Sequence, residues 1–498
     1  MIVGEDGKVV RVVRAGDEAR PANITSRIDV QRRTLLPGLI DAHGHVMDLG
    51  FMALQLDLSE TKSLADLQQR LRTYAAANPD VPWILGRGWN QELWPSKRFP
   101  TAADLDAVVS DRPVVLERVD GHAAVANSAA IKRAGITEVT PVPPGGRIEN
   151  GLFVDAAREM LVKAIPAPSE KDQHAALVKA QEILLGYGIT ATANMRTPIS
   201  EWRAFDRAGA AGQLRMRIFA YAYGVEPLKT ITRPTAWLHG DRLRLVGVKL
   251  YADGALGSRG AWLKQPYADR PDSRGLQFHS DAELLGLADQ AASKGFQLAI
   301  HAIGDAANSQ VIGVFEQLGR KYPGDRRWRI EHVQVVDPAD IPRFAPTGII
   351  ASMQPTHQTS DRLMAEARLE PDRLRGAYAW NSISHSGARL AFGSDFPFDR
   401  PNPFLGLSAA VSRQDPGGQP PGGWRPEERV TLDQALAGFT REAAYAGFAE
   451  DRLGSLEPGK WADFILVDRD INKVDPQALA STQVLETWVA GKKVWERK

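Results

Sequence analysis

The chain has no cysteine among its 498 residues, so it can form no disulfide bond and can offer no thiolate to a metal ion. Any metal site must therefore be built from histidine, aspartate, glutamate or a modified lysine. The sequence also lacks an apolar run long enough to cross a bilayer. The segment from Met1 to Arg20 is polar and lacks the apolar core of a secretory signal. We expect a cytoplasmic protein, or a periplasmic or secreted one if a signal peptide was removed from the start.

An excess of charge of either sign is also missing. Lysine and arginine number 61 and aspartate and glutamate 60, which leaves a net charge of +1. This balance argues against a nucleic-acid surface or an anionic membrane partner. Hydrophobic residues make up 43% and charged residues 24%, as in ordinary globular proteins. We expect a small-molecule substrate, no nucleic acid and no membrane, and leave a homo-oligomer open.

Short β-rich runs alternate with amphipathic helical stretches, such as 281–294 and 306–321, over most of the chain. The runs are 37–45, 188–193, 216–221, 245–250, 296–301, 329–332, 349–354 and 388–395. Strand–helix alternation predicts a parallel sheet, and eight such units predict an α/β fold closed as a (β/α)₈ TIM-like barrel.

One long interruption follows the first predicted strand. We interpret residues from about 58 to 185 as an insertion with its own helices, at 63–78 and 170–186, and a strand at 112–117. The two chain ends both contain short β-rich segments with turn signals. The predicted organisation is a barrel at 37–447 and a small β-sandwich shared by 1–36 and 448–498.

Ligand-type side chains gather where the predicted strands end, which is where barrel enzymes place their chemistry. His43 and His45 end the first strand two residues apart, so both side chains point the same way. Further ligand-type residues follow the same rule at strands four, five, six and eight: Lys249, His301, His332 and Asp395. The set predicts a divalent metal, zinc above all, as one or two ions.

Lys249 has two interpretations. It could be a partly buried lysine that pairs with a carboxylate or extends to the barrel mouth. It could instead be carboxylated by CO₂, which turns an ammonium into a two-oxygen ligand able to bridge a binuclear metal centre. We favour the carboxylated lysine.

Several motifs together resemble the amidohydrolase superfamily and, within it, the metal-dependent amidohydrolase 3 group that includes N-substituted formamide deformylases. The motifs lie at 37–45, 248–258, 301–305, 331–332, 352–357, 393–397 and 456–463. The resemblance covers essentially the whole chain and implies the following roles. The metal ligands are His43, His45, His301 and His332, with a bridging Lys249 and a catalytic Asp395 that also contacts metal. One departure occurs on strand two, where relatives often carry His-Asp and this chain has Ala193-Asn194; no role is assigned there.

Other segments look like the pocket-lining parts of the same group. The substrate-pocket candidates are Trp89, Trp94, Asp120, Asp253, Gln354 and His357. Core packing is the open alternative for the two tryptophans, and structural hydrogen bonding is the alternative for Gln354 and His357. His122 follows an Asp-Gly turn that would expose it, and we expect it to contact the scissile carbonyl or stabilise an oxyanion.

These assignments predict a hydrolase in which a metal-bound hydroxide attacks a non-peptide C–N bond, amide or formamide-like, while Asp395 moves the proton. The same chemistry could act on an ester, carbamate, ring amide or phosphotriester, because fold does not fix substrate. A non-catalytic metal-binding protein is a further alternative, but it would need no proton shuttle at Asp395.

Overall fold

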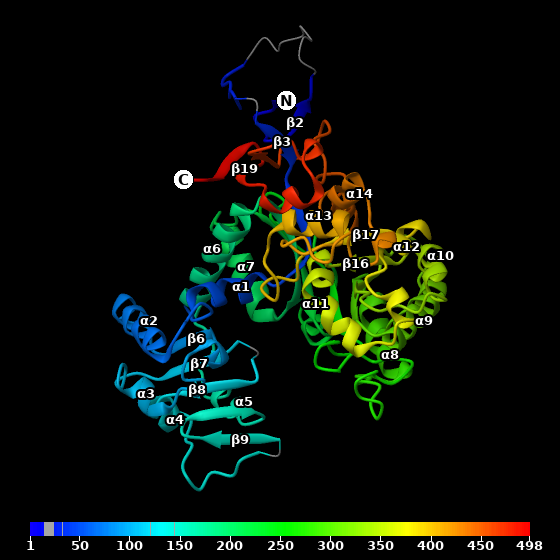
Figure 1. Cartoon of the computed structure of the whole chain (residues 1–498). Helices are drawn as coiled ribbons and strands as arrows, with labels where there is room; N and C mark the ends of the chain where they lie inside the picture. The colour runs from blue at the N-terminus through cyan, green and yellow to red at the C-terminus, as the bar shows by residue number, and fades with distance from the viewer. Residues whose placement is uncertain (14–23, 32, 120, 144) are drawn as a thin grey trace. The chain divides into compact units, whose positions relative to one another are not determined.

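The structure, a computed structural model, describes residues 1–13, 24–31, 33–119, 121–143 and 145–498. The chain divides into two compact units, coloured along the chain in Figure 1. Unit 1 contains Met1–Met47 and Ala180–Lys498, and unit 2 contains Asp48–Lys179. No helix in the described part of the chain combines the length and apolar character needed to span a bilayer.

Unit 1 is built on a sheet of eight parallel strands in consecutive order. The strands are β4 (Leu39–Gly44), β11 (Ile189–Thr197), β12 (Arg217–Tyr223), β13 (Leu243–Tyr251), β14 (Gln297–Ala302), β15 (Arg329–His332), β16 (Ile350–Met353) and β17 (Arg389–Phe392). The first and last strands meet through a bridge between Gly44 and Phe396, and the amide of Asp395 donates to the carbonyl of His43 over 2.7 Å. The predicted (β/α)₈ barrel is confirmed.

Glycine makes the closing seam of this barrel possible. A methyl group at Gly44 would lie 2.1 Å from the ring of Phe396, and one at Gly393 would lie 2.5 Å from the amide nitrogen of His43. Any larger residue would hold the two strands apart. The seam therefore fixes the distance between the histidines of β4 and the aspartate that follows β17.

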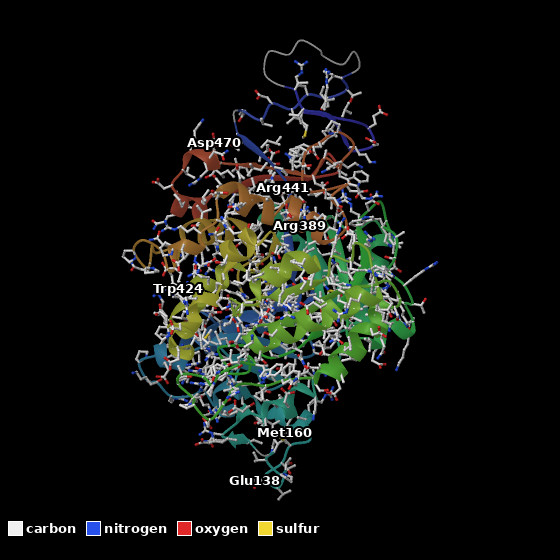
Figure 2. All side chains as sticks on the ribbon, turned by 90° about the vertical axis from the view of Figure 1, so that its right-hand side faces the viewer. Glu138, Met160, Arg389, Trp424, Arg441 and Asp470 are labelled. Atoms are coloured by element: carbon white, nitrogen blue, oxygen red, sulfur yellow. The ribbon has the colours of Figure 1, made fainter. Side chains whose placement is uncertain are left out.

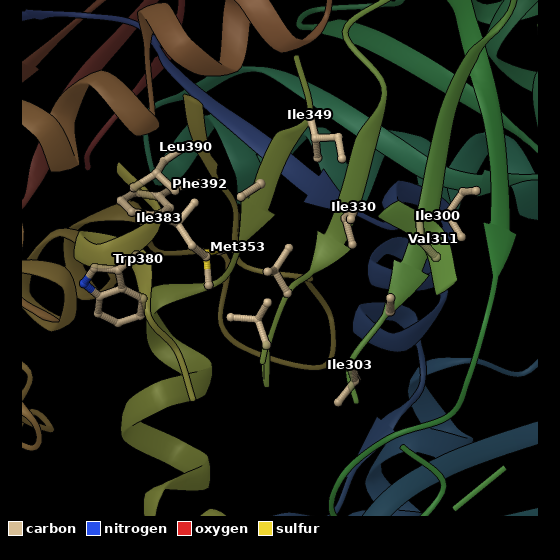
Figure 3. Packing of buried hydrophobic residues seen from close by; sticks show 14 of the residues in the cluster. Ile300, Ile303, Val311, Ile330, Ile349, Met353, Trp380, Ile383, Leu390 and Phe392 are labelled. Carbon is tan, nitrogen blue, oxygen red and sulfur yellow. The ribbon is translucent and has the colours of Figure 1, made fainter. Parts of the chain in front are cut away.

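Helices cover the outer face of the barrel. They are α7 (Ile199–Ala210), α8 (Asp281–Ala292), α9 (Asp305–Lys321), α10 (Phe344–Thr347), α11 (Pro355–Arg368), α12 (Trp380–His385), α13 (Pro403–Ser412), α14 (Leu432–Gly438) and α15 (Arg441–Ala446). Barrel strands are buried on both faces, so their sequences are almost continuously apolar. Figure 3 shows Met353, Leu390 and Phe392 of β16 and β17 packed beside Ile383 and Trp380 of α12 in the main hydrophobic core.

The amino ends of the strands are held by charged and aromatic side chains of the unit. Arg389, the first residue of β17, pairs with Glu442 over 2.8 Å and lies 3.9 Å over the ring of Tyr445. Figure 2 shows Arg389 and the neighbouring Arg441 on this part of the surface. Arg389 and Arg441 both have acidic or aromatic neighbours, so side chains at this end of the barrel stabilise the fold.

The two ends of the chain form a small two-layer β structure. A four-stranded antiparallel sheet contains β3 (Thr34–Pro37), β18 (Phe464–Val467), β19 (Val484–Val489) and β20 (Lys492–Glu496). The hairpin of β1 (Ile2–Val3) and β2 (Val9–Arg11) packs Val9 against Ala462, Phe464 and Trp488. The expected sandwich made from both chain ends is confirmed for the described residues.

Unit 2 carries its own six-stranded mixed sheet. Its strands, in sheet order, are β5 (Leu56–Asp57), β6 (Ile84–Trp89), β7 (Val114–Arg118), β8 (Ala123–Ala126), β10 (Leu152–Asp155) and β9 (Gly146–Glu149). Its helices are α2 (Leu64–Ala77), α3 (Ala102–Asp106), α4 (Ser128–Arg133) and α5 (Arg158–Val162), and α1 (Val46–Leu54) and α6 (Glu170–Gly186) connect the units. The sequence predicted only one of these strands, because the others are short and rich in glycine, alanine and charged residues.

Candidate metal centre

His43 in β4 and His45 directly after it face one carboxylate. His43 and His45 are 1% and 7% exposed, and their rings lie 5.6 Å apart. Nε2 of His43 is 3.4 Å from Oδ1 of Asp395, and Nε2 of His45 is 3.0 Å from the same oxygen. The i, i+2 spacing on a strand end thus brings both imidazoles to one point, as the sequence predicted.

Asp395 is held in an unusual backbone conformation directly after β17. Its φ is +60°, in the left-handed region that side chains other than glycine rarely adopt. The buried Asp41 fastens this turn, because its carboxylate accepts from both the amide and the hydroxyl of Ser394. Burial would raise the pKa of Asp395, but His43, His45 and His332 outweigh it and hold that pKa well below its usual range. The side chain is therefore an anion.

His301 and His332 complete a cluster of imidazoles from neighbouring strands. Their ring centroids lie 4.5 Å apart, and those of His43 and His332 lie 4.8 Å apart. Burial lowers the pKa of His43 to about 4 and that of His301 to about 3, and it holds the pKa of His332 well below its usual range. At neutral pH these rings are uncharged and keep a lone pair, the form that binds a metal ion.

Each of three imidazoles donates from Nδ1 to a fixed acceptor. Nδ1 of His43 lies 2.6 Å from Glu331, Nδ1 of His45 lies 3.0 Å from the carbonyl of Met195, and Nδ1 of His332 lies 2.8 Å from the side-chain oxygen of Gln354. These acceptors fix the tautomers and leave Nε2 as the free ligand atom.

The sequence gave no role to Arg329, and it named Glu331 only as part of a motif. The guanidinium of Arg329 donates to both Glu331 oxygens, over 2.8 and 3.1 Å, and also to the carbonyl of Ala42 and the hydroxyl of Ser352. Burial would raise the pKa of Glu331, but Arg329 and His43 outweigh it and hold that pKa well below its usual range. The Arg-x-Glu-His order on β15 was visible, but its cross-barrel contact with β4 was not.

This donor set fits a divalent cation. With Nδ1 of His43 donating to Glu331, its Nε2 presents a lone pair to the anionic Asp395 at 3.4 Å, so two acceptors face each other. Ligand atoms of His43, His332 and Asp395 all lie within 4.8 Å of one another. Nε2 of His301 is buried without a hydrogen-bond partner among the described residues, and Oδ1 of Asp253 lies 3.5 Å from it. A cation between these atoms would relieve each of these unfavourable arrangements.

Lys249 lies in the same layer, near the end of β13. It is 1% exposed, and its Nζ is 5.1 Å from the ring centroid of Tyr251. Burial lowers the pKa of Lys249 to about 8. Asn194, which stands where relatives often have an aspartate, instead accepts from the amide of Val46 over 2.7 Å and has a structural task.

The two pocket candidates that follow β16 lie beside the centre. Gln354 accepts the hydrogen bond from Nδ1 of His332 described above, which is the structural role that the sequence left open for it. His357, in the first turn of α11, stacks on His332 with ring centroids 6.2 Å apart. Its Nε2 lies 4.0 Å from Oδ2 of Asp395. His357 is thus placed to meet a group bound at the centre, and its pocket role stays a prediction.

Asp253, another predicted pocket residue, is fully buried beside His301. Its carboxylate is 0% exposed and accepts from the amides of Trp262, Ile303 and Gly304 over 2.8 to 3.0 Å, and its Oδ1 lies 3.5 Å from Nε2 of His301. Burial raises the pKa of Asp253 to about 7 despite these donors. The side chain ties the loop after β13 to the segment before α9, and its contact with substrate stays a prediction.

The remaining candidates belong to unit 2. The indoles of Trp89 and Trp94 are 0% and 1% exposed, and they donate to the carbonyls of Leu116 and Thr61 in that unit's core. Both indoles pack in this core, the alternative left open, and their pocket role stays a prediction. His122 is exposed, with Nδ1 2.9 Å from Asp155, and its catalytic role stays a prediction. Asp120 lies outside the described residues.

Comparisons with known proteins agree with this architecture. The profile of the amidohydrolase family matches residues 27–495. The chain is 32% identical to the putative amidohydrolase YtcJ of Bacillus subtilis, over 95% of this chain and 91% of the relative. It is 28% identical to the N-substituted formamide deformylase of Arthrobacter pascens, over 94% and 90%.

A crystal structure of an uncharacterized metal-dependent hydrolase from Pyrococcus horikoshii superimposes with a TM-score of 0.78. It shares 30% identity, and the match covers 89% of this chain and 88% of that one. The resemblance that the motifs indicated is confirmed, and the chain belongs to the amidohydrolase family.

Proposed function

We propose that this protein is a hydrolase that uses a divalent metal ion to cleave a non-peptide carbon–nitrogen bond, an amide or formamide-like bond. The observation that carries the proposal is the lone pair of His43 Nε2 facing the anionic Asp395 at 3.4 Å, within a ring of buried imidazoles. The N-substituted formamide deformylase among the relatives supports the choice of bond.

The residues that would hold the metal are the four histidines of the cluster, with Lys249 and Asp395. The donors are mostly imidazole nitrogens with a carboxylate oxygen and no sulfur, which favours zinc. When bound, such a cation activates water and polarises the carbonyl of the substrate.

The residues around this position divide the remaining work. Asp395 accepts a proton from the attacking water at a carboxylate oxygen and delivers it to the nitrogen of the leaving amine. The oxygen of water forms the new bond to the carbonyl carbon, the C–N bond breaks, and a carboxylic acid and an amine leave. Glu331, Met195 and Gln354 keep the imidazoles oriented throughout, because their hydrogen bonds do not involve the reacting atoms.

Removal and return of the metal tests this proposal. Exhaustive chelation should abolish hydrolysis of a panel of N-substituted amides, and zinc, manganese or cobalt should restore it. Matched esters, carbamates and phosphotriesters in the same panel identify the preferred bond. Full amide hydrolysis by protein shown to be metal-free, or turnover of esters alone, contradicts the proposal.

We further propose that Lys249 is carboxylated and bridges two metal ions. Its complete burial beside the histidine cluster supports this, since an ammonium buried away from water is costly. Protein loaded with ¹³C-bicarbonate and zinc should show a carbamate carbon resonance that Lys249→Ala lacks, together with loss of at least one zinc per chain. A single fully retained zinc and no carbamate signal would leave a mononuclear site.

A further inference from the structure

Few large apolar side chains remain exposed in the barrel part of the chain. In the fully described segment 180–498 they lie at the end of β12, in the loop after β13, on α11 and in the loop after β17. We call this group the apolar collar: Tyr223 (51% exposed), Leu276 (58%), Phe278 (47%), Leu363 (66%) and Phe398 (75%). Exposed apolar groups beside a candidate catalytic centre are typical of a ligand site.

The collar is continuous with the candidate metal centre on the β17 side. Phe398 follows Asp395 by three residues, and its ring stands edge-on to His45 with centroids 5.7 Å apart. Three-quarters of this phenylalanine is exposed even though it touches a buried histidine. An aromatic residue in this position covers no core of its own, so its apolar face is available to a molecule bound next to His45.

The collar also reaches the centre on the β13 side. The ring centroids of Tyr251 and His301 lie 5.2 Å apart. The ring of Tyr223 is perpendicular to that of Tyr251, with centroids 6.2 Å apart. The amide of Phe278 donates to the carbonyl of Ala252, the residue after Tyr251. Aromatic side chains therefore flank the imidazole cluster next to two different ligands.

Leu276 and Leu363 extend the collar beyond the aromatic rings. The amide of Leu276 donates to Gly260 in the loop after β13. Leu363 lies on α11, and Arg368 of the same helix donates to Gly257 in that loop over 3.2 Å. None of the five collar side chains carries a charge, so a charged group placed against them would lose water without gaining a partner.

We infer that the substrate carries a neutral apolar group, preferably an aromatic ring, next to its scissile bond, and that Phe398 is the specificity-determining residue that binds it. This inference rests on the proposed function and names the class of substrate for the same site. An edge-to-face contact with Phe398 favours a ring over an alkyl chain of equal area.

A graded series of acetamides tests the inference, with methyl, butyl, benzyl and 4-aminobutyl groups on nitrogen. Each buried methylene should raise kcat/KM about fourfold, so butyl should exceed methyl by about 50-fold. Benzyl should be at least as good as butyl, and the charged 4-aminobutyl amide should be no better than methyl. A flat series overturns the inference.

Binding without turnover separates this inference from the proposed function. Ketones with CH₂ in place of the amide NH cannot be hydrolysed, and calorimetry on the full-length protein should give them the same order of affinity. Phe398→Ala should weaken the benzyl ketone about tenfold and Phe398→Leu should restore most of that loss. Val10→Ala, an exposed apolar position of the β1–β2 hairpin, should match wild type.

Each outcome has one meaning. If the ketones bind in the expected order but none of the amides is hydrolysed, the collar inference stands and the proposed function is wrong. Amide hydrolysis with equal affinity for every ketone does the reverse. Self-association in sedimentation experiments that Phe398→Ala abolishes would make the collar an interface between copies and overturn the inference.

Discussion

The two ends of the barrel both contain buried charged and polar side chains, but they arrange them in opposite ways. At the amino end, Arg217 and Asp463 form a two-point ion pair over 2.7 and 2.9 Å, and Trp461 packs on the guanidinium. At the carboxyl end, uncharged imidazoles face Asp395 with their lone pairs, and Nε2 of His301 has no hydrogen-bond partner among the described groups.

This difference teaches which polar clusters stabilise the fold and which serve a ligand. Paired charges whose hydrogen bonds are complete are stable without a ligand. Acceptor atoms that face one another repel, and a bound cation removes this repulsion. The amino end should therefore control stability, and the carboxyl end should control activity at some cost to stability. Four predictions test this division.

Replacement of the central carboxylate should give the largest effect. Asp395→Asn keeps the size of the side chain but cannot accept a proton, so amide turnover should fall by about 10² to 10⁴-fold. The free energy of unfolding should change far less than for a change at Arg217. Asp399→Asn, in the same loop, is the matched control and should keep normal turnover. Near-normal turnover of Asp395→Asn would transfer the proton step to another group.

Disruption of the amino-end pair should produce the opposite result. Arg217→Met leaves Asp463 buried and unpaired, which should lower the free energy of unfolding by about 3–5 kcal/mol. Urea unfolding measures this loss, and metal content per folded molecule should not change. The double variant Arg217→Met, Asp463→Leu should recover part of the stability. A loss below about 1 kcal/mol, or a loss of metal, would show that the ends are not divided as we describe.

Glu331 sharpens the comparison because it is a paired charge at the carboxyl end. Glu331→Gln keeps an oxygen for Nδ1 of His43 but loses the ion pair with Arg329, so the imidazole is held less firmly. Zinc affinity should fall by about 10 to 100-fold, measured by competition with a chelating dye. Gln354→Leu removes the hydrogen-bond partner of Nδ1 of His332, and its zinc affinity should fall by a similar factor. Unchanged zinc affinity in both variants would make these partners purely structural.

An ion pair of unit 2 supplies a small reference effect. Asp104 caps α3 through Thr101 and accepts from Arg98 over two distances of 2.8 Å. The side-chain hydrogen bonds from Arg98 lead the causes that lower the pKa of Asp104 from 3.8 to about 2. Because the folded pKa lies below the unfolded one, this contribution is present above pH 3.8 and is lost as the pH falls through about 2.

The side chains of Asp104 and Arg98 are 15% and 48% exposed, so solvent screens the pair and Asp104→Asn should cost only about 1 kcal/mol. Amide hydrogen exchange in Ala102–Asp106 measures it at neutral pH and near pH 3. The difference between wild type and variant should be smaller at the lower pH. A difference that grows on acidification would mean that the pair is not what stabilises this helix.

Much of the barrel could be predicted from the sequence because most of its strands are short and mainly apolar, and most are followed by a helix. The positions of His43, His301, His332 and Asp395 at strand ends placed them on one face before any distance was known. Such a prediction needs only the direction and order of the strands, which alternation with helices determines.

Contacts across the barrel could not be predicted in this way. Glu331 bonds to His43 although β4 and β15 are not neighbours in the sheet, so no pairing rule connects them. Burial was equally hidden for Trp89, since a tryptophan before a turn has the same sequence signature in a core and in a pocket. The backbone amides that Asp253 anchors were hidden too, because a motif does not separate substrate contacts from loop anchors.

The pairing of β3 with β18 affects how the protein folds while it is being synthesised. Pro37 of β3 lies opposite Phe464 of β18 in the small sheet. β3 therefore cannot pair until a segment roughly 430 positions later in the chain has been synthesised. At about 5–20 residues per second on the ribosome, that wait is on the order of 20 to 90 s. During it, the edge of β3 is an open template for unwanted pairing. Expression at lower temperature or with a chaperone that shields nascent chains should therefore raise the yield of folded protein more than any change near the metal site.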